Sequence, residues 1–204
     1  MKPVALIGGG GHARSIVAML EGQRPIAGYV DVRPVENLDL PYLGTVSDFL
    51  SRHTPDEFDI HLAIGFGKGG SLAFRREMAL RYADFGAATL AAPSAWIAPG
   101  AAIGDGAAVM ARAVVNRSAI GRNAVINTGA IIEHDCQIGD NVFVGPGAIV
   151  CGGVTVGHDC FIGAGAVIRN GIDIAPGTVI GMGAVVTANI TEPAVYVGNP
   201  AKRI

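Results

Sequence analysis

Residues 120–186 read IGRNAV-INTGAI-IEHDCQ-IGDNVF-VGPGAI-VCGGVT-VGHDCF-IGAGAV-IRNGID-IAPGTV-IGMGAV-V when the chain is written in blocks of six. Every block begins with Ile or Val, so twelve β-branched aliphatic residues recur with a period of six. The fifth position of each block is usually small or β-branched, as at Ala124 and Cys136. A hexapeptide period is typical of a parallel β-helix, in which three blocks make one triangular coil and the aliphatic side chains stack inside it.

The repeat extends toward the N-terminus through Ile97, Ile103 and Val109. It then slips by one residue between Val115 and Ile120, which predicts a bulge or an altered corner there. Glycine often follows the aliphatic residue of a block. We expect these glycines to relieve the backbone at the corners, where a positive φ is often required.

The composition narrows the class of protein. Its 204 residues have room for one large or two small domains, and the net charge of −2 argues against nucleic acid or an anionic membrane as a partner. The apolar run Val4–Ile7 is too short for a signal peptide, and no run approaches the ~18 apolar residues of a membrane span. Cys136 and Cys160 occupy inward positions and are expected to be buried, reduced thiols, so we expect a cytoplasmic protein.

The first 90 residues have a different pattern. Buried strands are expected at 2–7, 26–30 and 61–65, helices at 14–20 and 72–85, and a short strand within 86–96 that leads into the coil. This alternation predicts an α/β fold. We therefore expect a small Rossmann-like domain over 1–90 and an all-β domain, the parallel β-helix, over 91–204.

A glycine-rich turn follows the first strand. Gly8-x-Gly10-x-x-Ala13 is a variant of the dinucleotide-binding fingerprint, and Asp31 ends the second strand where a ribose-binding carboxylate would lie. Free N–H groups at a helix N-terminus favour an anion such as a pyrophosphate. The alternatives are a tight turn without a ligand and an NAD-dependent enzyme. The second is disfavoured because about 90 residues are too few for two mononucleotide halves.

One block of the repeat carries acid–base chemistry. In Glu133-His134-Asp135 a histidine lies between two acids, and Asn127 holds the same slot in the preceding block as Glu133 does in its own. The pattern predicts that these four side chains gather near one corner. A histidine suits proton transfer at neutral pH, and a neighbouring carboxylate would fix its tautomer. A solvated histidine kept with acids for solubility is an equally good interpretation of these residues alone.

The chain resembles a known family at several points. The repeat and the ending Val197–Ile204 (VGNPAKRI) resemble the hexapeptide acyltransferases, whose coil is left-handed. The Gly-Gly-His-Ala turn, the Gly-Tyr-Val-Asp strand end and the Ala-Ile-Gly strand end narrow the resemblance. They are similar to the sialic-acid O-acetyltransferase and bacillosamine or perosamine N-acetyltransferase group. The resemblance implies a homotrimeric transferase of glycan and O-antigen biosynthesis that uses acetyl-CoA and no metal.

The resemblance also assigns roles to residues. His134 would be the general base and Asp135 its partner, while the nucleotide-linked sugar would be bound by Gly10, Gly11, His12, Asp31, Gly65, Asn127 and Glu133. Some members that bind uridine nucleotides have two acids at the end of the second strand. Here Asp31 is followed by Val32, which leaves UDP and GDP both open. His158, which also has an acid neighbour, is interpreted as a surface residue.

The resemblance places the coenzyme between adjacent coils of the trimer. Its expected contacts are Phe143, Gly145, Ala164 and Met182, and Phe143 takes the place of a coenzyme-contacting histidine of some relatives. A backbone N–H near Gly145 would stabilise the oxyanion. Lys202 and Arg203 would meet the coenzyme phosphates or form a solvated terminus.

The function implied is acetyl transfer from acetyl-CoA to a nucleotide-linked 4-amino-6-deoxy sugar. O-acetylation of a sialic acid or another sugar hydroxyl is the alternative within the family. A nucleotide-binding scaffold without turnover is the alternative outside catalysis.

Overall fold

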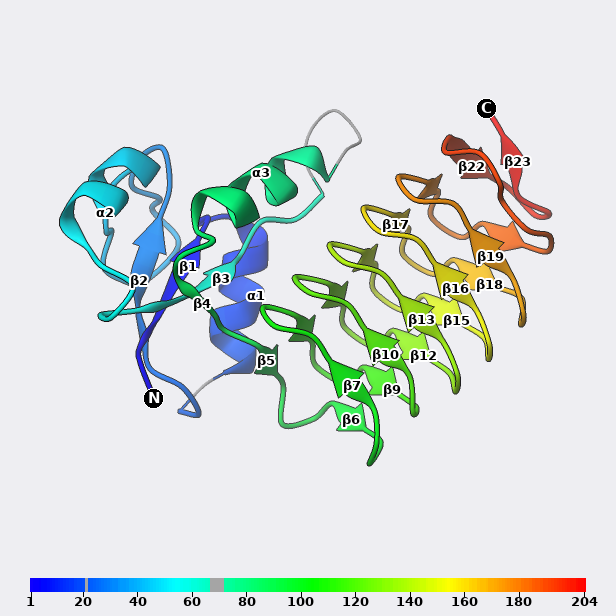
Figure 1. Ribbon diagram of the computed structural model, residues 1–204, viewed down its shortest axis with the longest axis horizontal. Helices are drawn as coiled ribbons and strands as arrows, with labels where there is room; N and C mark the ends of the chain where they lie inside the picture. Colours follow the sequence, from blue (N-terminus) through cyan, green and yellow to red (C-terminus); the bar gives the residue numbers. More distant parts are fainter. Residues whose placement is uncertain (21, 67–71) are drawn as a thin grey trace.

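The computed structural model describes residues 1–20, 22–66 and 72–204. Figure 1 shows an α/β unit, formed by the first part of the chain, beside one end of a long coil. The C-terminus lies at the other end of this coil (Figure 1).

The N-terminal unit contains a four-stranded parallel sheet with the strand order β2-β1-β3-β4. Its strands are β1 (Val4–Ile7), β2 (Ile26–Val30), β3 (Asp59–Leu62) and β4 (Gly86–Ala87). Its helices are α1 (Gly11–Met19), α2 (Val46–Arg52) and α3 (Ala73–Arg81). The three strands and two helices expected from the sequence are present, although β3 begins and ends earlier than predicted. Helix α2 was not predicted; it begins at a capping box between Thr45 and Asp48.

The sheet is covered on both faces, as its apolar strands require. Val4 and Leu6 of β1 pack in one cluster with α1. Ala5 and Ile7 point to the other face and pack with Phe49 of α2 and with α3. In the described parts of the chain, no helix is both long enough and apolar enough to cross a membrane.

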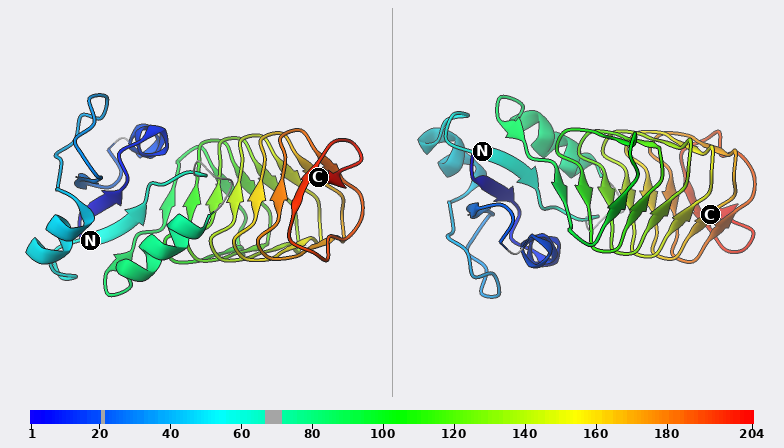
Figure 2. Two further views of the ribbon diagram at one scale, coloured as in Figure 1. Left: turned by 90° about the horizontal axis from the view of Figure 1, so that it is seen from above. Right: turned by 90° about the horizontal axis from the view of Figure 1, so that it is seen from below.

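The coil is a left-handed parallel β-helix with three sides, as predicted (Figures 1 and 2). The first side contains β5 (Leu90–Ala91), β8 (Ala108–Val109), β11 (Val125–Ile126), β14 (Phe143–Val144), β17 (Phe161–Ile162), β20 (Val179–Ile180), β22 (Val195–Val197) and β23 (Lys202–Arg203). The second side contains β6 (Trp96–Ile97), β9 (Val114–Val115), β12 (Ile131–Ile132), β15 (Ile149–Val150), β18 (Val167–Ile168) and β21 (Val185–Val186). The third side contains β7 (Ala102–Ile103), β10 (Ala119–Ile120), β13 (Gln137–Ile138), β16 (Thr155–Val156) and β19 (Asp173–Ile174).

The interior of the coil is the apolar stack that the period predicts. The aliphatic residue of each block from Ile120 to Val186 is buried, and so are the small residues at the fifth position, including Cys136 and Cys160. The coil begins earlier than the repeat indicates, because β5 already pairs with β8.

Three edges join the sides of the coil. We call the edge between the first and second sides the first edge, the edge between the second and third sides the second edge, and the remaining one the third edge. Successive blocks contribute to successive edges. Residues that stack on one edge are therefore eighteen positions apart in the sequence, or seventeen where the coil includes the one-residue slip. Neighbouring coils pair strand on strand, for example β11 with β14.

Two different structural requirements select glycine at the corners of the coil. A Cβ atom at Gly145, which follows an aliphatic residue, would lie 2.7 Å from the amide nitrogen of Ala164 in the next coil. Close approach between coils, rather than a positive φ, therefore requires glycine there. The positive φ of 64° belongs to Gly147, two residues later.

The N-terminal unit packs against the first side of the coil. Ala108, Val125 and Phe143, which point outward from that side, share one hydrophobic cluster with Leu6 and Ala13. Because this cluster joins both parts, a division into domains over 1–90 and 91–204 stays a prediction. In a triangular coil the second edge is opposite the first side, so it faces away from the N-terminal unit.

Candidate active site

A cavity of about 270 Å³ opens at the carboxyl ends of the parallel strands. Ligands of open α/β sheets bind at such a place. Three predicted substrate residues line it together with residues of α3, so we call it the sheet-edge pocket. Its lining is Ile7, Gly8, Gly10, Val30, Asp31, Val32, Val46, Ala63, Ile64, Gly65, Phe74 and Met78.

The glycine-rich turn forms one wall of this pocket. Gly8 has a φ of 107°, and a Cβ atom at Gly9 would lie 2.8 Å from the ring of Tyr29, so both glycines are required by the fold. A Cβ atom at Gly10 would meet nothing within 4 Å. Among the described residues, no side chain caps the start of α1 at Gly10. Its first N–H groups are therefore suited to an anion.

Asp31 holds the turn in place. Its carboxylate accepts hydrogen bonds from the N–H groups of Gly9 and Val32, each at 2.7 Å. The residue therefore links the ends of β1 and β2 beside the pocket. A contact between Asp31 and a ribose stays a prediction. The carboxylate lone pairs that these two bonds leave free would accept the ribose hydroxyl.

His12 lies apart from the pocket lining. Its ring packs against Phe143 of the coil, with 5.7 Å between the ring centroids, and its Nε2 atom is buried without a hydrogen-bond partner among the described residues. Burial, with smaller contributions from the nearby Arg75 and His61, lowers the pKa of His12 to about 3. Gly11 also lies outside the lining. The structure thus gathers Gly10, Asp31 and Gly65, and leaves sugar contacts of Gly11 and His12 as predictions.

The burial of His61 predicts acid sensitivity. His61 of β3 donates from Nδ1 to the carbonyl oxygen of Ala88 at 2.9 Å, and burial lowers its pKa to about 4. Below about pH 6.5 the unfolded chain binds a proton that folded His61 does not, so stability is lost as the pH falls from there toward about 4. From His61 we expect a loss of about 2 kcal/mol at pH 5, and the buried His12 is expected to add a comparable loss.

Urea unfolding at pH 7 and pH 5 measures this loss. The variant His61→Asn, which keeps a donor for Ala88, is expected to lose less stability between the two values. The control is His158→Asn, at an exposed site. This variant is expected to keep the pH dependence of stability of the unsubstituted protein. An unchanged pH dependence in His61→Asn would rule His61 out as its source.

The predicted base and its partner lie on the second edge, in the turn between β12 and β13. Nδ1 of His134 is 2.8 Å from Oδ2 of Asp135, and the two side chains are 61% and 81% exposed. With Nδ1–H donating to the carboxylate, Nε2 is free to accept a proton. The His134 ring lies over Gly152 of the next coil, where a Cβ atom would be 2.7 Å from Nε2.

The amide beside Glu133 is Asn116, and the prediction that Asn127 lies at this corner is wrong. Asn116 Nδ2 donates to Oε2 of Glu133 at 3.1 Å. Asn127 lies on the first edge, at the other end of β12, where its Oδ1 accepts from the N–H of Thr128 at 2.7 Å. Blocks six residues apart occupy successive edges, so an equal slot in two blocks does not bring two residues together.

The one-residue slip of the repeat lies directly beneath the His134 turn. Ser118, in the shortened corner, donates to the carbonyl oxygen of Glu133 at 2.5 Å and accepts from the N–H of Cys136 at 2.9 Å. The sequence predicted an altered corner but not its partner. The signal was available, because Ser118 lies one coil of eighteen residues before Cys136.

Three of the four predicted coenzyme residues share the first edge. Gly145, Ala164 and Met182 come from successive coils, and Asn127 precedes Gly145 on the same edge. Phe143 points outward from the first side and is buried against His12 and Phe161. The N–H of Gly145 donates to Ile162 at 2.7 Å, so it is not a free oxyanion donor.

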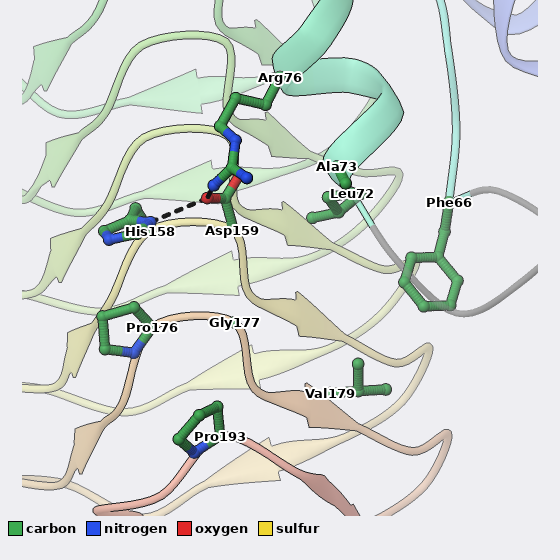
Figure 3. A pocket seen from close by; sticks show the side chains of 10 residues that line it. All are labelled: Phe66, Leu72, Ala73, Arg76, His158, Asp159, Pro176, Gly177, Val179 and Pro193. Atoms are coloured by element: carbon green, nitrogen blue, oxygen red, sulfur yellow. Dashed lines mark hydrogen bonds and ion pairs between the residues drawn. The ribbon is translucent and has the colours of Figure 1, made fainter.

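A second His–Asp pair lies on the third edge. His158 Nδ1 is 2.9 Å from Oδ2 of Asp159, but Asp159 is only 13% exposed and also accepts from Arg76 and Asn141. His158, Asp159 and Arg76 border a cavity of about 320 Å³ below the start of α3 (Figure 3). None of the predicted site residues lines that cavity, and His158 stays assigned to the surface.

Within the described residues, no cluster of three or more His, Cys, Asp or Glu side chains could hold a metal ion. In a single chain the pocket lies on the N-terminal unit, three of the predicted coenzyme residues lie on the first edge, and His134 lies on the second edge. Within one chain the predicted site residues therefore form three separate groups.

Comparisons with known families agree with both parts of the fold. Residues 3–78 match the PglD N-terminal domain. Residues 117–152 and 135–170 match the bacterial transferase hexapeptide (six repeats), and residues 153–188 match the hexapeptide repeat of succinyl-transferase. A search of curated proteins finds no match.

Solved structures match the whole chain. The acetyltransferase domain of PglB from Neisseria gonorrhoeae FA1090, in complex with acetyl coenzyme A, is 31% identical with a TM-score of 0.91, over 100% of this chain and 99% of that one. PerB from Caulobacter crescentus, in complex with CoA and GDP-perosamine, is 32% identical with a TM-score of 0.88, over 100% and 98%. WeeI from Acinetobacter baumannii AYE, at 23% identity and a TM-score of 0.83 over 100% of both chains, shares the fold.

Proposed function

The chain belongs to the hexapeptide-repeat acetyltransferases that carry a PglD-type N-terminal domain, and from this we propose that it acetylates the amino group of a nucleotide-linked sugar. Acetyl-CoA is the co-substrate, and the acceptor is the 4-amino group of a 6-deoxyhexose linked to UDP or GDP. The observation that carries the proposal is the whole-length similarity to PerB, a relative whose structure contains CoA and GDP-perosamine. Because acetyl-CoA is abundant in the cytoplasm, we place the reaction there.

The sheet-edge pocket is suited to the nucleotide. The open start of α1 at Gly10 would present N–H groups to the diphosphate, and Asp31, which lines the pocket, would accept a hydrogen bond from the ribose. Apolar side chains of the lining, such as Val32 and Phe74, are available for the base. This arrangement leaves the sugar to extend out of the pocket toward a catalytic group.

His134 acts as the general base. Its Nε2 takes the proton from the amine as the nitrogen attacks the thioester carbonyl, and Asp135 stabilises the imidazolium that forms. The tetrahedral intermediate then collapses with loss of the coenzyme thiolate. The family resemblance implies an oxyanion donor near Gly145. The N–H groups of Gly145 and Gly147 already donate within the coil, which argues against both as that donor.

The outward residues of the second side support a homotrimer. Along this side Val114, Ile131, Ile149, Val167 and Val185 point outward and remain half-exposed, and Trp96 is exposed at the start of the row. The equivalent residues of the third side include Gln137, Thr155 and Asp173, all exposed. A flat apolar face beside a polar one indicates an interface between copies of the chain.

A threefold arrangement would complete the active site. If three copies turn their second sides toward a common axis, the first edge of each copy meets the second edge of its neighbour. His134 of one copy then approaches Gly145 and Ala164 of another, on the edge that borders the first side and its N-terminal unit. This arrangement accounts for the separation of His134 from the pocket within one chain.

Filling the pocket tests its role. A Cβ atom at Gly65 would meet nothing within 4 Å, so Gly65→Phe can be accommodated by the backbone while its ring occupies the pocket. We expect the KM for the nucleotide sugar to rise at least about 10-fold with little change in the KM for acetyl-CoA. Equal KM values for the nucleotide sugar in both proteins would contradict binding in this pocket.

The acceptor is identified by measuring thiol release from acetyl-CoA with a small panel. The panel contains UDP- and GDP-linked 4-amino-4,6-dideoxy sugars and free sialic acid. Turnover with an amino sugar is the expected result and also identifies the base. Turnover with sialic acid alone would contradict N-acetylation and establish the O-acetyltransferase alternative. Coenzyme binding without turnover on any acceptor would favour a non-catalytic scaffold.

A further inference from the structure

Helix α3 contains an arginine that is buried between the N-terminal unit and the coil. Arg75 is 1% exposed, and burial lowers its pKa to about 10, which leaves it charged at neutral pH. Its guanidinium donates to amide oxygens of both parts of the chain. Burying a cation costs several kcal/mol, and an apolar side chain of similar size is often as stable at such a site. Stability of the fold alone therefore does not explain why an arginine is buried at this position.

The acceptors of Arg75 lie in two places. Nη1 donates to the carbonyl oxygens of Leu62, at 3.2 Å, and Ile64. These residues form the end of β3 and lead to Gly65 at the rim of the sheet-edge pocket. On the coil, Nη2 donates to the carbonyl oxygen of Asn123 at 2.7 Å, and Nε donates to Oδ1 of Asn141 at 3.1 Å. One planar guanidinium thus connects the pocket rim with two coils.

The coil is adapted to this contact along its third edge. Asn123, Asn141 and Asp159 are eighteen residues apart and have φ angles of 54°, 56° and 59°. A left-handed backbone disfavours side chains, although Asn and Asp tolerate it best. The same turn position is glycine in four consecutive coils on the first edge, at Gly129, Gly147, Gly165 and Gly183. The third edge therefore has polar residues where α3 runs beside it.

A second layer of contacts holds the start of α3. Asn141 Nδ2 donates to the carbonyl oxygen of Leu72 at 3.2 Å and to Oδ1 of Asp159 at 2.6 Å. The Oδ2 atom of Asp159 accepts from Arg76 at 2.7 Å. Figure 3 shows the Arg76 side chain extending from α3 to Asp159. The same helix contributes Phe74 and Met78 to the sheet-edge pocket. A shift of α3 against the coil would therefore move the pocket wall.

We propose that Arg75 is a positioning residue, which together with Asn141 and Asp159 fixes the sheet-edge pocket relative to the coil and so sets where the acceptor amine meets the base. The inference rests on the proposed function, because it assigns the network a purpose in that reaction. His134 and the pocket lie on separate parts of the fold. Their alignment therefore depends on how the N-terminal unit is seated. A displacement of about 1 Å can reduce a rate about 100-fold.

The variant Arg75→Met tests the proposal, because it removes the guanidinium group and its hydrogen bonds while keeping an unbranched apolar side chain that can fill the space. We expect the KM for the nucleotide sugar to rise at least about 10-fold and kcat to fall, while the KM for acetyl-CoA changes less than about 2-fold. Arg75→Lys keeps the positive charge but lacks the planar guanidinium group, so its KM for the nucleotide sugar is expected to remain raised. The control is Arg81→Met, at the exposed end of α3. Unchanged kinetic constants in Arg75→Met would overturn the proposal.

A second variant covers the case in which Arg75→Met does not fold. Asp159→Asn removes the charge that faces Arg76 and keeps a residue that tolerates the left-handed backbone. We expect a smaller rise in the same KM. No change in a folded Asp159→Asn protein would overturn the part of the proposal that includes Asp159.

Hydrogen exchange separates this proposal from the proposed function. In a folded Arg75 variant we expect the peptide covering 60–66 to exchange faster than in the unsubstituted protein, while the peptide covering 143–156 of the coil is unchanged. This readout needs no acceptor. If the unsubstituted protein acetylates no nucleotide sugar, the proposed function fails, and the exchange result still decides whether Arg75 couples the two parts. Identical exchange at 60–66 would overturn the coupling.

Discussion

The variant His134→Ala is expected to lose about 100- to 10,000-fold in kcat for acetyl transfer, with the KM for acetyl-CoA little changed. The loss follows from the arrangement at the second edge. Nδ1 of His134 is 2.8 Å from the Asp135 carboxylate, so in the proposed mechanism Nε2 is the atom that removes the proton of the amine. Asp135→Asn keeps a side chain suited to the left-handed backbone and removes only the charge. The loss of kcat in Asp135→Asn is expected to be smaller than the loss in His134→Ala.

The coil provides a matched control for this experiment. His158 has the same sequence neighbour, nearly the same distance to its carboxylate and a similar exposure, but it lies on the third edge. His158→Ala is expected to keep the kcat of the unsubstituted enzyme. An equal loss in both variants would mean that general effects on the coil, rather than base catalysis at His134, explain the result.

The variant Ile149→Arg is expected to abolish both the trimer and the activity. Ile149 is in the middle of the apolar row on the second side, where three copies of the residue would face one axis. Three guanidinium groups would meet there without counter-charges, and a buried unpaired charge costs several kcal/mol. We expect sedimentation to report monomers and the thiol-release rate to fall by at least about 100-fold, since His134 loses its partner copy.

Thr155→Arg is the control, because Thr155 points outward from the third side beside Asp173 of the next coil. It is expected to remain trimeric and active. A monomeric Thr155→Arg, or a trimeric Ile149→Arg, would place the interface on a different side of the coil.

Much of the fold is predictable from the period alone. The twelve aliphatic residues indicate the coil because a six-residue spacing places each of them inside a triangular β-helix, where all twelve are buried. Helix α2 was missed although its capping box, Thr45 with Asp48, is visible in the sequence. Its seven residues are too few for a clear apolar period.

The site was harder to predict because the repeat has two periods. Six residues separate successive sides, but eighteen separate neighbours on one edge. Comparison by six placed Asn127 beside Glu133, whereas comparison by one coil identifies Asn116. The same comparison reveals the outward row Ile131, Ile149, Val167 and Val185, which the six-residue period hides. The buried Arg75 has no such signal, because its acceptors lie up to 66 residues away in the sequence.

The most direct test of the account is complementation between two impaired variants, assayed with the nucleotide sugar well below its KM. His134→Ala retains an intact pocket, and Gly65→Phe retains an intact His134. When the two chains are co-expressed in equal amounts, random assembly should pair an intact pocket with an intact His134 at about one quarter of the interfaces. We predict about that fraction of the thiol-release activity of the unsubstituted enzyme. Mixed trimers with no activity above that of either variant alone would contradict a site shared between copies.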